Sequence, residues 1–145
     1  MVVASRSSVS ALGAAAKDIS VRASNIANQR NSLPVDRVEI SAAARSAAAN
    51  ADGDHDSIYK PGKVTYDSVE GGGVRLVVDQ KSPSHQVVFN PSDPNTDEMG
   101  RVAIPNTDTI NELVGVRQAR TMFDANLALI RAENQMAGTL LDSMG

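Results

Sequence analysis

The apolar side chains near the N-terminus recur at helical spacing. Intervals of three and four residues alternate through Val9, Leu12, Ala16, Ile19, Ala23 and Ile26. This alternation is typical of the a and d positions of a helix that packs along one narrow seam. Ser7 or Ser8 can cap its start, and Pro34 follows a polar stop at residues 28–31. We therefore expect a helix over residues 9 to about 28.

The C-terminal stretch repeats this alternation over a greater length. Its seam runs through Leu113, Val116, Arg120, Phe123, Leu127, Ile130, Asn134, Ala137, Leu141 and Met144. Thr109 and Glu112 have capping-box spacing just after Pro105, so we expect this helix to begin near Thr109. Such a helix reaches roughly 50 Å, whereas a compact domain of this length is about 30 Å across. The pattern therefore predicts an elongated molecule.

Two polar residues, Arg120 and Asn134, interrupt the C-terminal seam. Burying either side chain without a partner is costly. Either both reach polar partners on a neighbouring chain and specify register, or the helix is rotated so that both are exposed. The sequence leaves both interpretations open.

Between the two helices the pattern changes to short β-like runs. They cover residues 64–66, 74–78, 86–89 and 101–104, with three glycines at 71–73 as a tight connection. Ahead of them, the Ala-rich residues 41–50 form either a short helix or a linker. The expected fold is mainly α, with long terminal helices that pair as a coiled coil and a small β insert. Its segments are an N-terminal helix (1–31), a variable linker (32–58), a β-rich middle (59–104) and a C-terminal helix (105–145).

The N-terminal helix carries too little apolar surface to be stable alone. Its four large seam residues contribute at most ~6–12 kcal/mol on full burial. Fixing about twenty residues of backbone costs on the order of 1–2 kcal/mol each. The helix therefore needs other helices to complete its packing, which favours assembly over a free monomer.

Composition excludes several functional classes. The chain of 145 residues has 14 basic and 17 acidic side chains, so no general basic field is available to hold nucleic acid. It has no Cys, which rules out disulfides, thiolate metal sites and thiol catalysis. No run of about 18 apolar residues is present, and the N-terminus lacks the basic and apolar regions of a Sec-type signal peptide.

The acidic stretch with Asp52, Asp54 and Asp56 is the nearest approach to a metal site, because it matches the first ligands of a calcium loop. Ser57 and Lys63 stand where such a loop needs Gly and Glu. A solvated acidic turn is therefore the favoured interpretation.

Other candidate chemistry is weaker still. His55 and His85 have no second ligand at suitable spacing, and residues 71–73 lack the Lys and Ser or Thr of a phosphate-binding loop. No serine lies in a G-x-S-x-G pattern. We expect neither an enzyme nor a cofactor.

Two sets of residues resemble a known family. The first is Ala23-Ser24-Asn25-Ile26-Ala27-Asn28, which resembles the A-x-N-(I/L)-A-N signature of the bacterial flagellar axial family of rod and hook proteins. The second is more selective and resembles the pattern of proximal rod proteins of the FlgC type. It comprises Phe89-Asn-Pro-Ser-Asp-Pro94, Asp97-Glu-Met-Gly100-Arg-Val102, Ile104-Pro105-Asn106-Thr-Asp108, Glu112-Leu113 and Ala119-Arg120-Thr-Met-Phe123-Asp-Ala125-Asn126.

The resemblance implies a structural function. Such proteins are exported through the flagellar type III apparatus without a cleaved signal, and they polymerise helically in the basal-body rod, in the periplasmic space. The rod transmits motor torque to the hook. Terminal helices form an inner coiled-coil layer, so the expected partners are further copies of this chain, other rod proteins, the MS-ring and export-gate base and the export machinery. No small-molecule substrate or nucleic acid is implied.

The residues expected in the assembly interface are the larger members of both seams: Val9, Leu12, Ile19, Ile26, Leu113, Val116, Arg120, Phe123, Leu127, Ile130, Asn134 and Leu141. Asn25 and Asn28 are expected to be structural, since an Asn amide can satisfy carbonyls freed at a helix end and tolerates left-handed backbone geometry. Two alternatives stay open. One is another axial rod or hook subunit, and a less favoured one is a helical adaptor or export chaperone that clasps a partner.

Overall fold

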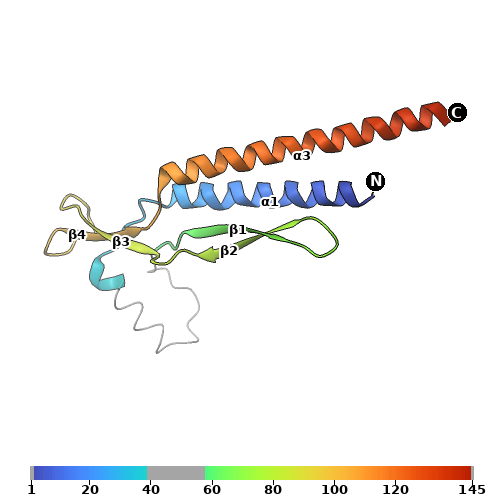
Figure 1. Cartoon of the computed structure of the whole chain (residues 1–145). Helices are drawn as coiled ribbons and strands as arrows, with labels where there is room; N and C mark the ends of the chain where they lie inside the picture. The colour runs from blue at the N-terminus through green and yellow to red at the C-terminus, as the bar shows by residue number, and fades with distance from the viewer. Residues whose placement is uncertain (1, 39–57, 145) are drawn as a thin grey trace. The chain divides into compact units, whose positions relative to one another are not determined.

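The computed structural model describes residues 2–38 and 58–144. Along the chain it has helix α1 (Val2–Ala27), strands β1 (Gly62–Ser68), β2 (Val74–Gln80), β3 (His85–Phe89) and β4 (Arg101–Pro105), and helix α3 (Thr109–Met144) (Figure 1). Residues 35–38 are also helical. Long terminal helices and a small β-rich middle confirm this part of the expected fold class. The Ala-rich residues 41–50 and the acidic stretch with Asp52, His55 and Asp56 lie outside the described residues.

Helix α1 begins earlier than the sequence pattern predicted. The expected caps, Ser7 and Ser8, lie inside the helix, so this part of the prediction is wrong. The preceding residues contain neither Gly nor Pro, so nothing stops the helix there. Ser8 is buried, and the hydroxyl of Ser10 donates to the carbonyl of Ser7 at 2.8 Å, which satisfies it within the helix.

The other helix ends lie near their predicted positions. Helix α1 stops at Ala27, and both the backbone N–H and the side-chain amide of Asn28 donate to the carbonyl of Ser24, at 3.1 and 2.8 Å. Helix α3 begins at Thr109. The Thr109 hydroxyl donates to the side-chain oxygen of Gln29, a residue in the turn that follows α1.

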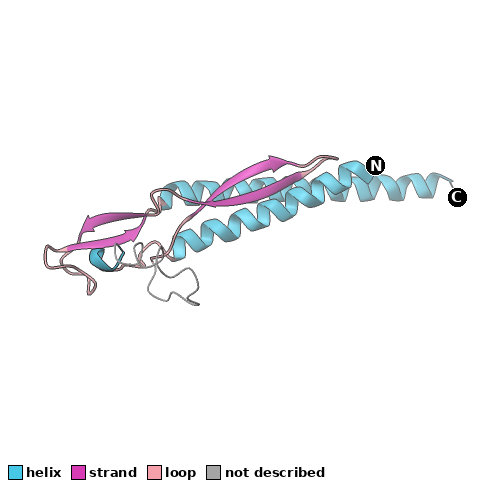
Figure 2. Ribbon diagram, turned by 90° about the horizontal axis from the view of Figure 1, so that it is seen from below, coloured by secondary structure: helices cyan, strands magenta, loops and turns pink. Residues whose placement is uncertain are grey.

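The described chain divides into two compact units, each built from separate stretches of sequence. Unit 1 contains α1 up to Ala23, the β1–β2 hairpin and α3 from Ile110. Within it α1 and α3 lie side by side and run in opposite directions (Figures 1 and 2). The hairpin contacts α1 through the N–H of Val74, which donates to the hydroxyl of Ser10 at 3.1 Å.

A glycine is needed where this hairpin meets α1. Gly73 has a φ of 105°, a left-handed conformation that side chains rarely adopt. A Cβ atom there would also overlap the Ser10 hydroxyl. The sequence prediction that residues 71–73 form a tight connection between strands is confirmed, since they link β1 to β2.

Unit 2 contains residues 24–62 and 80–109, as far as they are described. In it β3 and β4 pair antiparallel, with Val87 opposite Ala103. On the other side of β4, Ala103 exchanges both backbone hydrogen bonds with Leu33, at 3.0 and 2.9 Å. The middle of the chain therefore holds two separate two-stranded sheets, one in each unit, rather than a single β insert.

The buried apolar residues of the described chain are few and mostly small: Ala14, Ala15, Ile58, Leu76, Val102, Ala103 and Ala119. Fully burying a large aliphatic side chain contributes about 1.5–3 kcal/mol, whereas an Ala contributes far less. The described part of the chain thus has a small core and keeps many large apolar side chains exposed.

Candidate functional site

The predicted seam of α1 lies mostly at the surface of the single chain. Val9 is exposed, and Leu12, Ile19 and Ile26 are half-buried. Four of the five residues of α1 that the chain itself buries lie one position before those of the seam, at Ser8, Ala15, Asp18 and Asn25, and the fifth is Ala14. Helix α1 therefore turns a small, polar stripe toward its own chain and leaves the apolar seam largely uncovered.

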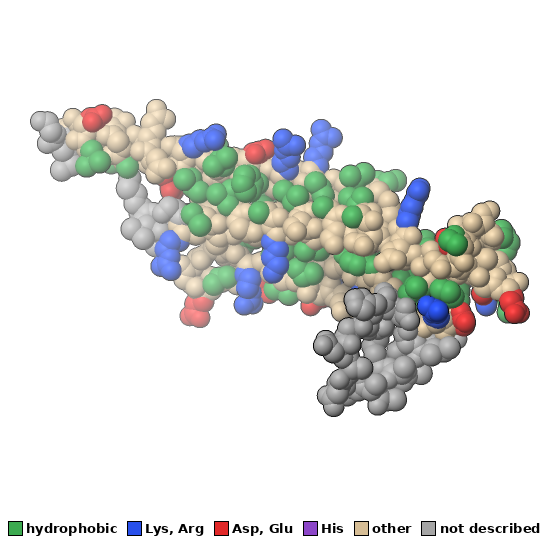
Figure 3. Space-filling view, turned by 180° about the vertical axis from the view of Figure 1, so that it is seen from behind, with side chains coloured by type: hydrophobic (Ala, Val, Ile, Leu, Met, Phe, Trp, Pro, Cys, Tyr) green, Lys and Arg blue, Asp and Glu red, His purple; other side chains and the backbone are tan. Residues whose placement is uncertain are grey.

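The seam of α3 is also open. Leu113 and Leu141 are exposed, and Val116, Phe123, Leu127 and Ile130 are half-buried. Further exposed apolar side chains along the same helix are Ile110, Val114, Met122, Leu129, Met136 and Leu140. Figure 3 shows hydrophobic side chains gathered along one face of the molecule, over the helices. Unit 1 thus leaves large apolar side chains uncovered along both helices.

Arg120 and Asn134 are both exposed in the single chain. This exposure agrees with a rotated helix. It agrees equally with two side chains whose polar partners belong to a neighbouring chain. The two interpretations made from the sequence therefore both stay open.

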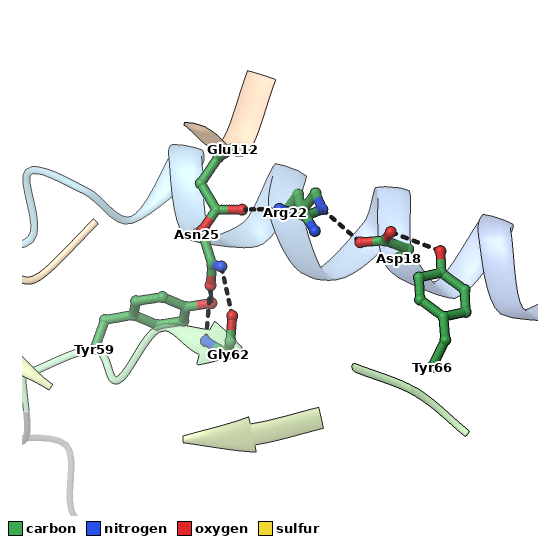
Figure 4. A network of polar contacts seen from close by, with 7 residues as sticks. All are labelled: Asp18, Arg22, Asn25, Tyr59, Gly62, Tyr66 and Glu112. Carbon is green, nitrogen blue, oxygen red and sulfur yellow. Dashed lines mark hydrogen bonds and ion pairs between the residues drawn. The ribbon is translucent and has the colours of Figure 1, made fainter. Parts of the chain in front are cut away.

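A charged cluster holds α1 against α3 inside unit 1 (Figure 4). Arg22 donates from Nε to Oδ1 of Asp18 at 2.6 Å and from one terminal nitrogen to Oε2 of Glu112 at 3.2 Å. The side chains of Asp18, Glu112 and Arg22 are 4%, 13% and 22% exposed, so the three charges are largely withdrawn from water. A guanidinium shared by two carboxylates satisfies both with its fixed fork of donors.

The cluster extends to the hairpin through Tyr66. Its hydroxyl donates to Oδ2 of Asp18 at 2.7 Å. Partial burial of the phenol and this hydrogen bond to a carboxylate raise the pKa of Tyr66 well above its usual value. Tyr66 is therefore a neutral hydrogen-bond donor over the whole physiological pH range. Asp18 thus accepts hydrogen bonds from Arg22 of α1 and from Tyr66 of β1.

Gly115 provides the space for the Arg22 guanidinium. A Cβ atom at position 115 would overlap the guanidinium of Arg22. Glycine within a helix costs about 1 kcal/mol relative to alanine, so its presence here is explained by the close approach of a side chain.

The motif residues near the end of α1 form a second polar group, within unit 2 (Figure 4). Asn25 is 0% exposed; its amide donates to the carbonyl of Gly62, and its oxygen accepts from the N–H of Gly62. The Tyr59 hydroxyl lies 2.9 Å from the Asn25 oxygen and 3.1 Å from the Ser24 hydroxyl. Ala27 is exposed. No non-glycine residue of the described chain has a positive φ, so neither Asn25 nor Asn28 adopts the left-handed geometry that Asn tolerates.

The motif residues around the start of α3 are partly structural. Pro105 is buried, and Asn106 donates from its backbone to Ser84 and from its side chain to Pro83, both at 3.0 Å. Asp108 and Ala125 are exposed. Asn126 donates to the carbonyl of Met122 at 2.7 Å, one turn earlier in the helix. These contacts explain the positions of several motif residues by their structural role, with no need for a catalytic function.

The loop between β3 and β4 is organised by one carboxylate. Asp97 accepts from the N–H groups of Arg101 and Met99, at 2.7 and 3.0 Å, and from Nε of Arg101 at 2.9 Å. The backbone N–H of Arg101, followed by its guanidinium and the N–H of Met99, lowers the pKa of Asp97 below its usual value. At the end of β3, Phe89 is 75% exposed and packs on Gly100.

Sequence reasoning missed Asp18, Arg22, Tyr66 and Gly115. Asp18 and Arg22 carried a usable signal, because opposite charges four residues apart lie on one helix face. Gly115 in a strong helical pattern was a second signal, since a glycine there usually has a packing reason. Neither signal identifies Glu112 or Tyr66 as a partner, because those contacts join distant parts of the sequence.

Within residues 2–38 and 58–144, no three His, Cys, Asp or Glu side chains gather as a metal site would require. His85 lies at the start of β3, with its ring 3.4 Å from the Ser84 hydroxyl. A shallow groove on α3 is lined by Ala132, Gln135, Met136, Thr139 and Leu140. Neither of the two long helices, where described, is apolar enough to cross a membrane.

Comparison with known proteins identifies relatives with one common description. The chain is 29% identical over 134 residues to the flagellar basal-body rod protein FlgC of Salmonella typhimurium, with 88% of this chain and 85% of that protein covered. It is 27% identical over 119 residues to FlgC of Yersinia enterocolitica, covering 77% and 88% of the two chains. FlgC of Agrobacterium fabrum is 31% identical over 68 residues, 47% of this chain and 48% of that protein. No family model matches the chain.

These matches confirm the resemblance that the motifs carry, and they support a FlgC-type flagellar rod protein. The relatives are named as rod proteins, so they indicate a structural subunit rather than an enzyme.

Proposed function

We propose that this chain is a structural subunit of the flagellar basal-body rod. The observation that carries the proposal is the match to FlgC rod proteins over 88% of the chain. The open apolar surfaces of α1 and α3 support it, because a subunit of a helical filament must keep such surfaces for its neighbours.

In this proposal the seams of α1 and α3 pack against the terminal helices of neighbouring subunits as a coiled coil. The interface includes Ile19 and Leu127, which are half-buried in the single chain. The subunit is elongated, with segments 1–31 and 105–145 in the packed layer, 59–104 as the β-rich part and 32–58 as a variable link. Arg120 and Asn134 lie in the same layer and contact polar groups there.

The proposed partners are further copies of the chain, other rod proteins and the MS-ring and export-gate base. The chain reaches the periplasmic part of the basal body through the type III export machinery, without a cleaved signal. It performs no chemistry and transmits torque from motor to hook. The small buried core of the described residues supports export in an unfolded state, since little stability has to be overcome.

The test is to isolate basal bodies from cells that carry a tagged copy of the chain and to locate it in a density map. We expect the tag at the proximal rod. Density for the chain outside the rod would overturn the proposal. A soluble, stoichiometric complex with one exported protein would instead support the adaptor or chaperone alternative.

A further inference from the structure

The packing of α1 on α3 poses a register problem. The buried apolar side chains on the two helices, as far as they are described, are all alanines: Ala14, Ala15 and Ala119. Small side chains fit against one another equally well when one helix slides past the other by a turn. Some other contact must therefore select one axial position.

The Arg22 cluster (Asp18, Arg22, Glu112 and Gly115) is specific to a single position. Glu112 and Gly115 are three residues apart on α3, so the carboxylate and the gap above the glycine lie on one face. The guanidinium of Arg22 uses both features at once. It bonds to the carboxylate of Glu112, and it packs where a Cβ atom of residue 115 would be.

No neighbouring register offers the same pair. A slide of one turn in one direction replaces Gly115 by Ala119 and Glu112 by Val116, so the guanidinium meets a methyl group and loses its carboxylate. A slide in the other direction replaces Gly115 by Asn111 and Glu112 by Asp108, so a carboxylate remains but an amide side chain fills the gap over the glycine. In either case the guanidinium, which Asp18 holds on α1, loses the gap over Gly115.

We propose that the Arg22 cluster sets the axial register between α1 and α3, with the Arg22 guanidinium over Gly115 as the contact that is specific to one position. This inference concerns the single chain and does not depend on the proposed function. As a consequence, the seam of α1 (residues 9–26) and the seam of α3 (residues 113–141) keep one fixed axial position relative to each other.

Spin labels measure the register directly. The chain has no native Cys, so cysteines introduced at the exposed Ser20 of α1 and Gln118 of α3 accept one label each in the full chain. We expect a single narrow distance for the otherwise unchanged chain. In Arg22→Ala and in Gly115→Ala the distribution should broaden or move by about 5.4 Å, the rise of one helical turn. A matched control, Gly138→Ala, adds a methyl group to the same helix where nothing lies within 4 Å, and it should leave the distance unchanged.

Thermal unfolding separates the register contact from a general loss of helix. Gly138→Ala should raise the melting temperature by a few degrees, because alanine is the better helix former. Gly115→Ala should lower it, because the guanidinium is displaced from its two carboxylates. In the Arg22→Ala background, Gly115→Ala should raise the melting temperature as Gly138→Ala does, since nothing remains to be displaced.

Three results would overturn the inference. The first is an unchanged narrow distance in both Arg22→Ala and Gly115→Ala. The second is a broad distance in the unchanged chain, because a register contact must select one alignment. The third is a lower melting temperature when Gly115→Ala is added to Arg22→Ala. Such a result would mean that Gly115→Ala does not act through the Arg22 guanidinium.

Discussion

The side-chain amide of Asn25 pairs with both backbone groups of Gly62, 37 residues later in the chain. Its nitrogen donates to the Gly62 carbonyl at 2.9 Å, and its oxygen accepts from the Gly62 N–H at 3.0 Å. An extended strand could make the same two bonds with Gly62. One buried side chain thus takes the place of a strand neighbour and fastens the end of α1 to the start of β1, within unit 2.

We expect Asn25→Ala to destabilise the chain markedly. It leaves the N–H and carbonyl of Gly62 without their side-chain partner, and each buried group left unpaired costs about 1–3 kcal/mol. Urea unfolding of the full chain should show a loss of roughly 2–4 kcal/mol. Asn28→Ala is the matched control: its amide meets only a helix-end carbonyl, so the loss should stay near ~1 kcal/mol. Equal and small losses in both variants would contradict this role of Asn25.

Stability should depend on pH through Asp97. The pKa of its carboxyl group is lower in the folded chain than its usual value of 3.8. Such a group stabilises the fold fully above the unfolded value and loses this contribution as the pH falls through the folded one. The melting temperature of the unchanged chain should exceed that of Asp97→Asn by a constant amount from neutral pH to about pH 4.5, and the difference should shrink below pH 3.8. A difference that already disappears near pH 6 would argue against the depressed pKa.

Gly100→Ala should destabilise the loop between β3 and β4 for two separable reasons. Gly100 has a φ of 74°, where a side chain costs about 1–2 kcal/mol. The added Cβ would also lie 2.7 Å from Cε2 of Phe89, so the ring must move. In a Phe89→Ala background only the backbone part should remain, as measured by urea unfolding of the four chains. A Gly100→Ala variant as stable as the unchanged chain would contradict both parts.

Charges placed in the seams should block rod assembly, if the proposed function holds. Ile19→Asp and Leu127→Asp each put a carboxylate into the proposed interface, where burial of an unpaired charge costs several kcal/mol. We expect both variants to be exported but not to swim, as scored by soft-agar spreading and counts of complete basal bodies. Ser20→Asp, at an exposed position next to Ile19, is the control and should swim. Normal swimming of both seam variants would show that these residues do not face the packed layer.

The elements of this fold could be predicted because each is a local pattern. Alternating apolar spacings gave the two helices, and β-branched runs between glycines and prolines gave four strands close to their observed bounds. The first turns of α1 were missed because the apolar pattern stops at Val9 while the helix does not. Helical backbone continues through polar residues wherever nothing interrupts it.

What could not be predicted is which stripe of α1 the chain buries. An apolar seam is expected to be covered, yet here Ala15 and Asp18 are buried and Val9 is exposed. The reason lies in contacts across long separations, such as Asp18 with Tyr66 and Arg22 with Glu112. A periodicity describes one helix at a time, and it carries no information about which distant residue supplies the complementary charge.

The composition of unit 1 from distant stretches has a consequence for synthesis. Arg22 leaves the ribosome well before its partner Glu112, which follows 90 residues later. Until then α1 has no helix to pack on, and its short nascent helix is only marginally stable in water. Folding of unit 1 is therefore completed only late in translation or afterwards. Under the proposed function, this delay leaves an interval in which the export machinery can take up the chain before unit 1 has folded.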